Sequence, residues 1–191
     1  MNTKEKILNE SMKLFSVKGF DAVSIRSIAD AVGVSNSALY KHYPSKQAIF
    51  DAIVEKSKAH FLKQCDYAQN SMCVNMESFV QMCLSMFDFQ INDDWIVMFR
   101  RVLLIEQFKN EKMAQIFNDF FIEFPITSQK LTFEKLIEDG IMISKNPEVL
   151  AMELYAPFFI YHTAKYDVEK LMELFRMHVE YFYLENFKEE E

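Results

Sequence analysis

Only three glycines and four prolines occur in the 191 residues of this chain, and their scarcity limits the folds that it can adopt. Antiparallel sandwiches and barrels need a turn after every short strand, and such turns are rich in glycine, proline and asparagine. The phosphate-binding loops of nucleotide-binding folds also need several glycines. Half of the residues are hydrophobic, which is enough to bury a core in a chain of this length. The composition therefore predicts an all-α protein.

The first fifty residues contain short helical patterns separated by clear stop signals. Gly19 and Gly33 stand where helices end, and Ser24 and Ser35 stand at N-cap positions. Pro44 ends the last of these patterns because proline disfavours a helical conformation in the residue before it. Two-turn helices are unstable alone, so the short ones must pack on the longer first helix. We expect helices over residues 4–18, 25–32 and 36–43.

Helical spacing of apolar residues continues to the C-terminus. Pro125 interrupts one such pattern, and Pro157 is expected to bend or break another. Asp93 or Asp94, Asn146 and Asp167 can serve as N-caps. The expected helices cover residues 46–67, 75–90, 95–108, 113–124, 131–143, 147–165 and 168–187. We expect about nine helices in all.

The net charge of −7 is unevenly distributed along the chain. Residues 1–50 carry seven basic and four acidic side chains, a net charge of +3, whereas residues 51–191 carry −10. Such asymmetry is typical of a protein in which one segment meets a polyanion. A window of fifty residues also varies by chance, so the charge alone does not decide between the two explanations.

Several functional classes are disfavoured by what the sequence lacks. Cys65, Cys73 and Cys83 form no CxxC pair and the histidines are isolated, so we expect no disulfide framework, no metal site and no cofactor. No Ser-His-Asp, Cys-His or phosphate-loop arrangement supports an enzyme. The N-terminus MNTKEKILNE is not a signal peptide, and no apolar run is long enough for a membrane span. We expect a cytoplasmic protein with no membrane partner.

Residues 7–50 combine the N-terminal signals in one continuous pattern, ILNESMKLFSVKGFDAVSIRSIADAVGVSNSALYKHYPSKQAIF. Its distinctive elements are Leu14-Phe15, Gly19-Phe20, Ser24, Ile28-Ala29, Gly33-Val34-Ser35, Leu39-Tyr40 and His42-Tyr43-Pro44-Ser45-Lys46. Two short helices joined by a glycine turn are typical of a helix-turn-helix. The whole pattern resembles the TetR family of bacterial transcriptional regulators. Ser37 departs from it, since the family often has glycine there, and its hydroxyl is expected to alter operator preference without harming the fold.

The resemblance implies a three-helix helix-turn-helix DNA-binding domain at residues 1–46. It implies a larger helical domain for ligand binding and dimerisation at residues 47–191. Such a protein binds a palindromic operator in double-stranded DNA as a homodimer, most often as a repressor that a small apolar or aromatic effector releases. Two alternatives remain open at this point. One is a TetR-like protein that acts mainly through protein contacts, and the other is a small helical ligand-binding protein without specific DNA recognition.

The expected DNA-contacting residues lie around the two short helices. Helix N-termini at Ser24 and Ser35 can bind phosphates through backbone N–H groups, and Lys46 adds a positive charge at a third. The exposed side chains of the third helix can read bases, since asparagine pairs with adenine and an aromatic ring meets the thymine methyl. The serines can equally be caps alone, Lys41 can be a solvated lysine, and Tyr43 is expected in the core. The full set is Ser24, Arg26, Ser27, Ser35, Asn36, Ser37, Tyr40, Lys41, His42 and Lys46.

Two further sites are expected in the larger domain. An effector pocket among the middle helices has the candidates Met82, Met86, Trp95, Phe99, Leu103, Phe117, Phe121 and Phe158, although plain core shows the same spacing. Ten aromatic residues lie between Val149 and Phe187, which favours an interface with a second copy over a core buried within one chain. The interface candidates are Tyr155, Phe159, Phe175, His178 and Phe182.

Overall fold

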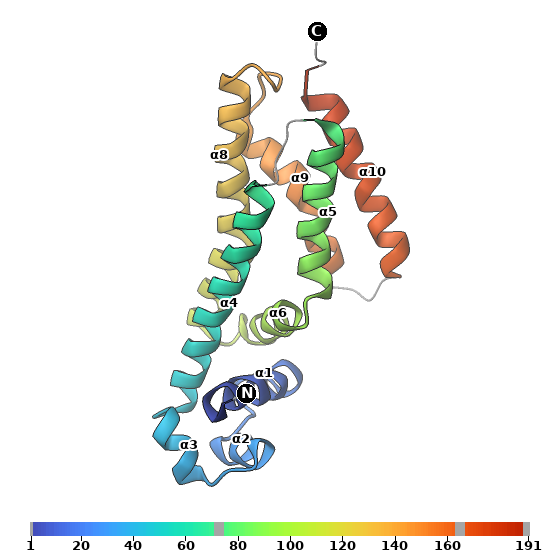
Figure 1. The fold of residues 1–191 in the computed structure, drawn as a ribbon. Helices are drawn as coiled ribbons and strands as arrows, with labels where there is room; N and C mark the ends of the chain where they lie inside the picture. Colours follow the sequence, from blue (N-terminus) through green and yellow to red (C-terminus); the bar gives the residue numbers. More distant parts are fainter. Residues whose placement is uncertain (1, 71–74, 163–166, 189–191) are drawn as a thin grey trace. The chain divides into compact units, whose positions relative to one another are not determined.

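The computed structural model describes residues 2–70, 75–162 and 167–188, and its regular elements are helices (Figure 1). They are α1 (Thr3–Lys18), α2 (Ile25–Val32), α3 (Asn36–His42), α4 (Lys46–Asn70), α5 (Met76–Asn92), α6 (Asp94–Glu106), α7 (Glu111–Asn118), the π-helical turn η1 (Asp119–Glu123), α8 (Phe124–Glu138), α9 (Pro147–His162) and α10 (Val168–Asn186). The segments α7, η1 and α8 follow one another without a break, so the described ranges hold nine separate helical stretches. The all-α prediction is confirmed.

The chain divides into two compact units. Unit 1 comprises Met1–Gln64 and Asp93–Phe117, and unit 2 comprises Cys65–Asn92 and Asn118–Glu191. The division expected at residue 46 separates functions, and it stays a prediction. The two compact units have other boundaries. Helix α4 begins at Lys46, and most of it belongs to unit 1, as does α6, which packs on α1.

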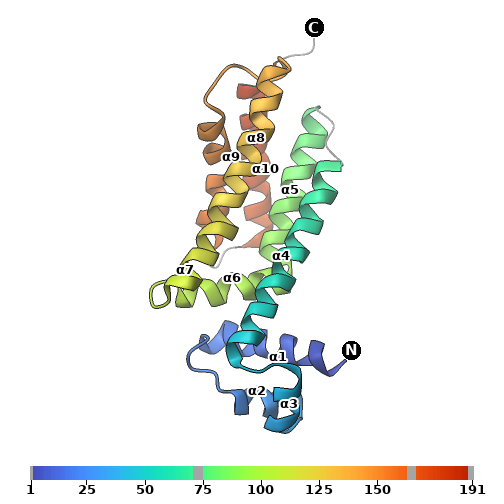
Figure 2. The same cartoon turned by 90° about the vertical axis from the view of Figure 1, so that its left-hand side faces the viewer.

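Local capping fixes the helices at the start of unit 1, which Figure 2 shows from the side. The Ser24 hydroxyl accepts from the Ser27 N–H, and the Ser27 hydroxyl accepts from the Ser24 N–H, so the two form a capping box. Gly33 ends α2 in the left-handed conformation, with φ of +79°, where glycine carries no Cβ penalty. The Ser35 hydroxyl accepts from the Ala38 N–H and starts α3. The predicted boundaries of α1, α2 and α3 therefore agree with the structure to within one residue.

The short helices of unit 1 are held by a shared apolar core. Phe15, Phe20 and Phe50 form an aromatic cluster whose ring centroids lie 5.2–6.4 Å apart. Further buried side chains come from all four N-terminal helices, among them Ile7, Met12, Ile28, Ala29, Val32, Leu39, Ile49 and Ile53. Each large apolar side chain buried here contributes about 1.5–3 kcal/mol, which stabilises helices too short to persist alone.

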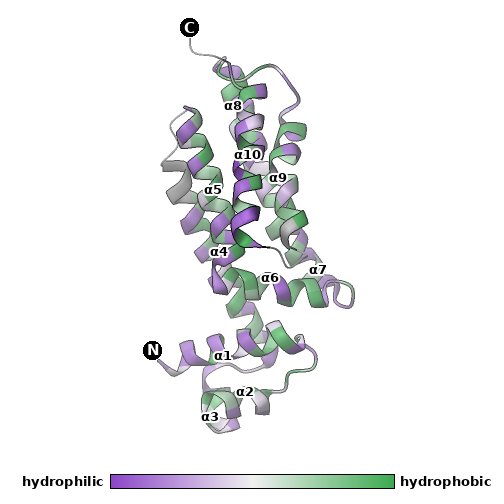
Figure 3. Cartoon of the chain, turned by 90° about the vertical axis from the view of Figure 1, so that its right-hand side faces the viewer, coloured by the Kyte–Doolittle hydropathy of each residue, from purple (hydrophilic) through white to green (hydrophobic). Residues whose placement is uncertain are grey.

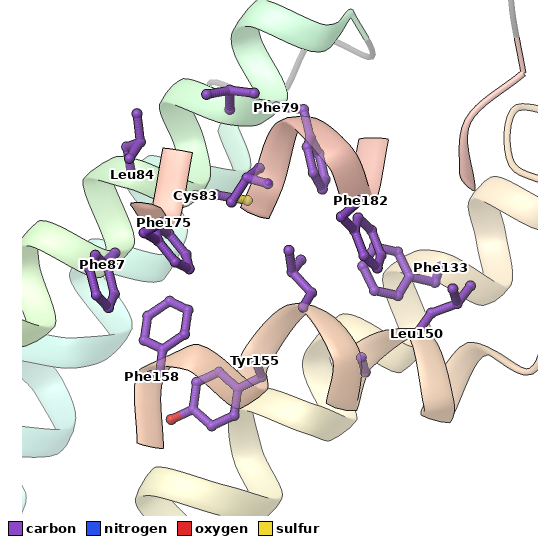
Figure 4. Close-up of a cluster of buried hydrophobic side chains, with 14 of the residues drawn as sticks. Phe79, Cys83, Leu84, Phe87, Phe133, Leu150, Tyr155, Phe158, Phe175 and Phe182 are labelled. Carbon is purple, nitrogen blue, oxygen red and sulfur yellow. The ribbon is translucent and has the colours of Figure 1, made fainter. Parts of the chain in front are cut away.

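Unit 2 has a second core between α5, α8, α9 and α10 (Figure 4). The Phe87 and Phe175 rings stack at 4.0 Å, and the Phe158 ring meets both at 5.0–5.1 Å. Figure 4 shows these three rings grouped together, with Tyr155 beside Phe158 at 4.8 Å. Burial also raises the pKa of the Cys83 thiol to about 12, so this cysteine stays protonated and unreactive at neutral pH.

This core corrects the expected dimer interface. Tyr155, Phe175 and Phe182 are buried within one chain, so assigning them to a surface between two chains was wrong. Phe159 is half-buried against the same core, and His178 stacks on Phe175. Tyr155 and Phe158 on α9 and Phe175 and Phe182 on α10 lie on the inward face of each helix, whereas Tyr181 on α10 is exposed, and composition alone does not distinguish these cases. Much of the aromatic excess therefore lies in the core of unit 2.

The structure also corrects the effect of Pro125. We expected Pro125 to interrupt the helix, which would resume at Leu131 and run to Ile143. Instead η1 widens the helix just before Pro125, and α8 continues from it and ends at Glu138. Proline has no N–H for the carbonyl four residues earlier, that of Phe121. The buried Tyr155 hydroxyl donates to this carbonyl at 2.8 Å instead.

The last helices begin as expected. The side chains of Asn146 and Asp167 cap α9 and α10. α9 continues through Pro157 to His162, and the expected extension to residue 165 lies outside the described residues. None of the described helices combines the length and apolar composition needed to cross a membrane. The described residues also bring together no group of three or more His, Cys, Asp or Glu side chains that could hold a metal ion.

Candidate nucleic-acid interface

Helix α3 has one buried and one exposed side. Leu39 and the C-capping Tyr43 are buried against the rest of unit 1. The Tyr40 side chain is 51% exposed, which is unusual for a large aromatic residue in a small helix. The other side chains exposed on α3 are those of Asn36, Ser37, Lys41 and His42. The structure therefore brings together all five α3 residues that the sequence predicts as DNA contacts.

Two serines at the start of α3 are joined by their hydroxyl groups. The Oγ atoms of Ser35 and Ser37 lie 3.0 Å apart, and Ser35 Oγ also accepts from the Ala38 N–H. Both residues are exposed. The pair holds the Ser37 hydroxyl close to the helix N-terminus, at the position where the TetR pattern often has glycine.

Two of the predicted residues around α2 form hydrogen bonds within the helix terminus itself. Ser24 and Ser27 cap the helix, and the Ser27 hydroxyl also donates to the Ser24 carbonyl oxygen at 2.7 Å. A contact between DNA and either hydroxyl would compete with these bonds. Arg26 is exposed next to them and carries the formal positive charge of this segment.

Lys46 lies at the start of α4, and its ammonium group is engaged within unit 1. Its Nζ donates to the carbonyl oxygens of Phe20 at 2.7 Å, Val23 at 2.9 Å and Asp21 at 3.3 Å. It also lies 4.3 Å from the centroid of the Phe20 ring. The expected phosphate contact of Lys46 would require this network to open, because an ammonium group has only three N–H donors.

Lys4 was absent from the predicted set. Its Nζ lies 5.5 Å from the centroid of the Tyr43 ring, which places a positive charge beside the end of α3. Burial raises the pKa of the Tyr43 hydroxyl, so this residue is neutral at physiological pH. The sequence shows only that Lys4 lies in the first turn of α1, and no local signal indicates that α1 begins beside α3.

The expected pocket residues are divided between the two units. Trp95, Phe99, Leu103 and Phe117 belong to unit 1, and Met82, Met86, Phe121 and Phe158 belong to unit 2. The Trp95 indole N–H donates to the Ser57 hydroxyl at 2.8 Å, and Lys56 Nζ lies 3.8 Å from the centroid of the indole. Met82, Met86 and Trp95 are half-buried, and the other five are buried.

A capped helix pair with a buried inner side and an exposed polar and aromatic outer side defines a helix-turn-helix protein that binds DNA. Comparison with known proteins identifies the same class. The sequence profile described as bacterial regulatory proteins, tetR family, matches residues 7–53. The HTH-type negative transcriptional regulator IcaR of the biofilm operon icaADBC in Staphylococcus aureus is 26% identical over 145 residues, which cover 70% of this chain and 77% of IcaR.

Solved structures with the same fold cover nearly the whole chain. A transcriptional regulator from Aquifex aeolicus has a TM-score of 0.75 at 18% identity, covering 94% of this chain and 99% of its own. A TetR-like regulator from Rhodococcus has a TM-score of 0.67 at 16% identity, covering 93% of each chain. Residues 7–53 of this chain thus match the tetR family of bacterial regulatory proteins, and the chain as a whole shares its fold with these solved regulators. The helix-turn-helix of this family binds DNA.

Proposed function

We propose that this regulator is a homodimeric repressor that binds a palindromic operator and that a small apolar or aromatic molecule releases. The observation that carries the proposal is the exposed row of Asn36, Ser37, Tyr40, Lys41 and His42 on a recognition helix whose inner side is buried. Repression is also the role stated for IcaR, a negative regulator.

The exposed residues divide between base reading and phosphate binding. Asn36 carries an amide that can pair with adenine, and the Tyr40 ring can contact a thymine methyl. Arg26, Lys41 and His42 can donate to phosphates, which position the protein without reading sequence. Lys4 extends the same positive surface beside Tyr43.

Operator binding is tested by a gel-shift titration with DNA that flanks the regulator's own gene, at several salt concentrations. We expect one site to bind at least about 1,000-fold more tightly than random DNA, as is usual for specific regulators. The affinity should fall steeply with salt because phosphate contacts release counterions. Binding no tighter than to random DNA at every flanking site would contradict the proposal.

The dimer is proposed to form through α9 and α10, on faces that differ from those predicted. Leu174, Met177, Tyr181 and Leu184 are exposed at spacings of three or four residues along one face of α10. Val149, Met152 and Ile160 form a corresponding row on α9. In Figure 3, where α10 faces the viewer, hydrophobic residues recur among hydrophilic ones along this helix. Apolar rows of this length favour a partner, and a second copy presents the same rows to itself.

The effector is proposed to bind in unit 2, beside the candidates that lie on α5. Met82 and Met86 are half-buried, and flexible methionine side chains adapt to ligands of different shape. The Phe158 ring contacts Phe87, Tyr155 and Phe175, which favours core packing for this candidate. A ligand releases the operator only by its difference in affinity between the DNA-binding state and the released state.

A further inference from the structure

The residue Phe20 is held from both sides in the connection between α1 and α2. Its N–H donates to Glu106 Oε1, at the end of α6, at 2.9 Å. Its carbonyl oxygen accepts from Lys46 Nζ, at the start of α4, at 2.7 Å. One peptide segment in unit 1 is therefore bonded to two helices that are distant from it in the sequence.

This segment determines where the helix-turn-helix begins. Gly19 ends α1 with φ of +81° and ψ of 161°, a combination that essentially only glycine adopts. A Cβ atom on residue 19 would collide with the Glu106 carboxylate, so the glycine also allows this close approach. Four residues after Phe20, Ser24 starts α2. A displacement of Phe20 therefore changes the position from which α2 and α3 start.

The Glu106 carboxylate is unusual for a purely structural contact. The residue is 1% exposed, and its Oε2 atom has no hydrogen-bond partner among the described residues. A buried carboxylate with one donor is incompletely compensated for the loss of water. Loss of its bond to Phe20 would leave the carboxylate without a partner among the described residues, which is costly for a buried charged group, so Glu106 and the Phe20 segment are expected to stay together.

We propose that Glu106 is a positioning residue for operator recognition. Its carboxylate, at the end of α6, holds the Phe20 segment in the conformation that binds the operator. Lys46 holds the same segment from α4. The two side chains together therefore bind both the N–H and the carbonyl oxygen of Phe20. The inference rests on the proposed function, because its effect is measured as operator affinity.

Three substitutions at one position test the inference. Glu106→Ala removes the acceptor, and Glu106→Asp retracts the carboxylate by one methylene while keeping its charge. Glu106→Gln keeps an Oε1 acceptor without the charge. Glu111→Ala, at an exposed glutamate in the same unit, is the matched control. Operator affinity and circular dichroism are measured under identical conditions, and hydrogen exchange reports the protection of the Phe20 amide.

We expect about tenfold weaker operator binding for Glu106→Ala and Glu106→Asp, within the usual range of coupling between sites. Both variants should remain folded and exchange the Phe20 amide faster. Glu106→Gln should bind within about threefold of the wild type, and Glu111→Ala should match it. A merely structural role would lower thermal stability without changing the affinity of the folded protein.

Unchanged or tighter operator binding by folded Glu106→Ala and Glu106→Asp would overturn the inference and leave the proposed function intact. Failure of Glu106→Gln to restore binding would also overturn it, because the acceptor would then not be the important group. Absence of specific DNA binding by the wild type would instead remove the proposed function, and this inference with it.

Discussion

At the residue scale, Lys46 and Lys4 differ from what their sequence positions suggest. Lys46 lies in the most recognisable run of the family pattern, yet its ammonium group donates to three backbone carbonyls within unit 1. Lys4 lies in an ordinary first turn, yet its charge is next to Tyr43 and the end of α3. We therefore propose a structural role for Lys46 and a phosphate contact for Lys4.

Lys46→Ala should lower the free energy of unfolding by about 2 kcal/mol, because hydrogen bonds from a charged donor are lost and three carbonyls lose a partner. Urea denaturation measures this loss. Lys41→Ala, at an exposed lysine, should change stability by less than about 0.5 kcal/mol. A Lys46→Ala variant of wild-type stability would contradict the structural role.

Lys4→Ala should weaken binding to all DNA sequences to a similar degree. The slope of log affinity against log salt concentration should fall by about one unit, since one phosphate contact is lost. Tyr40→Ala should instead change the preference among operator bases. Lys13→Ala is the control for Lys4, because Lys13 lies on the same helix and pairs with Glu10 at 2.8 Å. An equal change in slope for Lys4→Ala and Lys13→Ala would exclude a specific contact by Lys4.

At the element scale, one proline changes the course of a long helix without ending it. Pro125 cannot donate to the Phe121 carbonyl, and η1 accommodates the mismatch over Asp119–Glu123. The hydroxyl of Tyr155 on α9 takes the place of the missing donor. Helix α8 is thus fixed to α9 at the point where its own hydrogen bonding is interrupted.

Tyr155→Phe should lower the free energy of unfolding by about 1–3 kcal/mol, because it leaves a buried carbonyl without this donor. In a Pro125→Ala background the same substitution should cost less, since an alanine at this position supplies the N–H that proline lacks. Urea denaturation of the four proteins in this cycle measures the coupling. An identical cost of Tyr155→Phe in both backgrounds would show that the two residues act independently.

At the scale of the whole molecule, the proposed dimer and the proposed palindromic operator depend on each other. A palindromic operator requires two recognition helices in fixed relation, which a two-fold dimer provides. The apolar rows of α9 and α10 are the surfaces proposed to form that dimer. Tyr181 and Leu184 are the most exposed members of the α10 row, at 60% and 65%.

The double substitution Tyr181→Glu and Leu184→Glu should produce a folded monomer, because the introduced charges oppose burial between two copies without touching the core. Light scattering measures the mass, and gel shifts should show loss of operator binding at concentrations that saturate the wild type. Arg176→Glu, on another face of α10, should remain dimeric. A monomeric wild type, or a dimeric double variant, would argue against this interface.

The sequence by itself determined the features that depend on neighbours a few residues away. The Ser24 and Ser35 caps, the left-handed Gly33 turn and the exposed row on α3 all follow from contacts within four residues, so local patterns were sufficient to predict them.

Only the tertiary structure decided which partners distant residues have. Phe20 meets Lys46 after 26 residues and Glu106 after 86. Tyr155, Phe175 and Phe182 turn inward, whereas Tyr181 on α10 is exposed. The spacing of apolar residues shows that a helix has a buried face, but not which other helix covers it. The roles of Lys46, Glu106 and Tyr155 therefore depend on packing between elements, which no local pattern specifies.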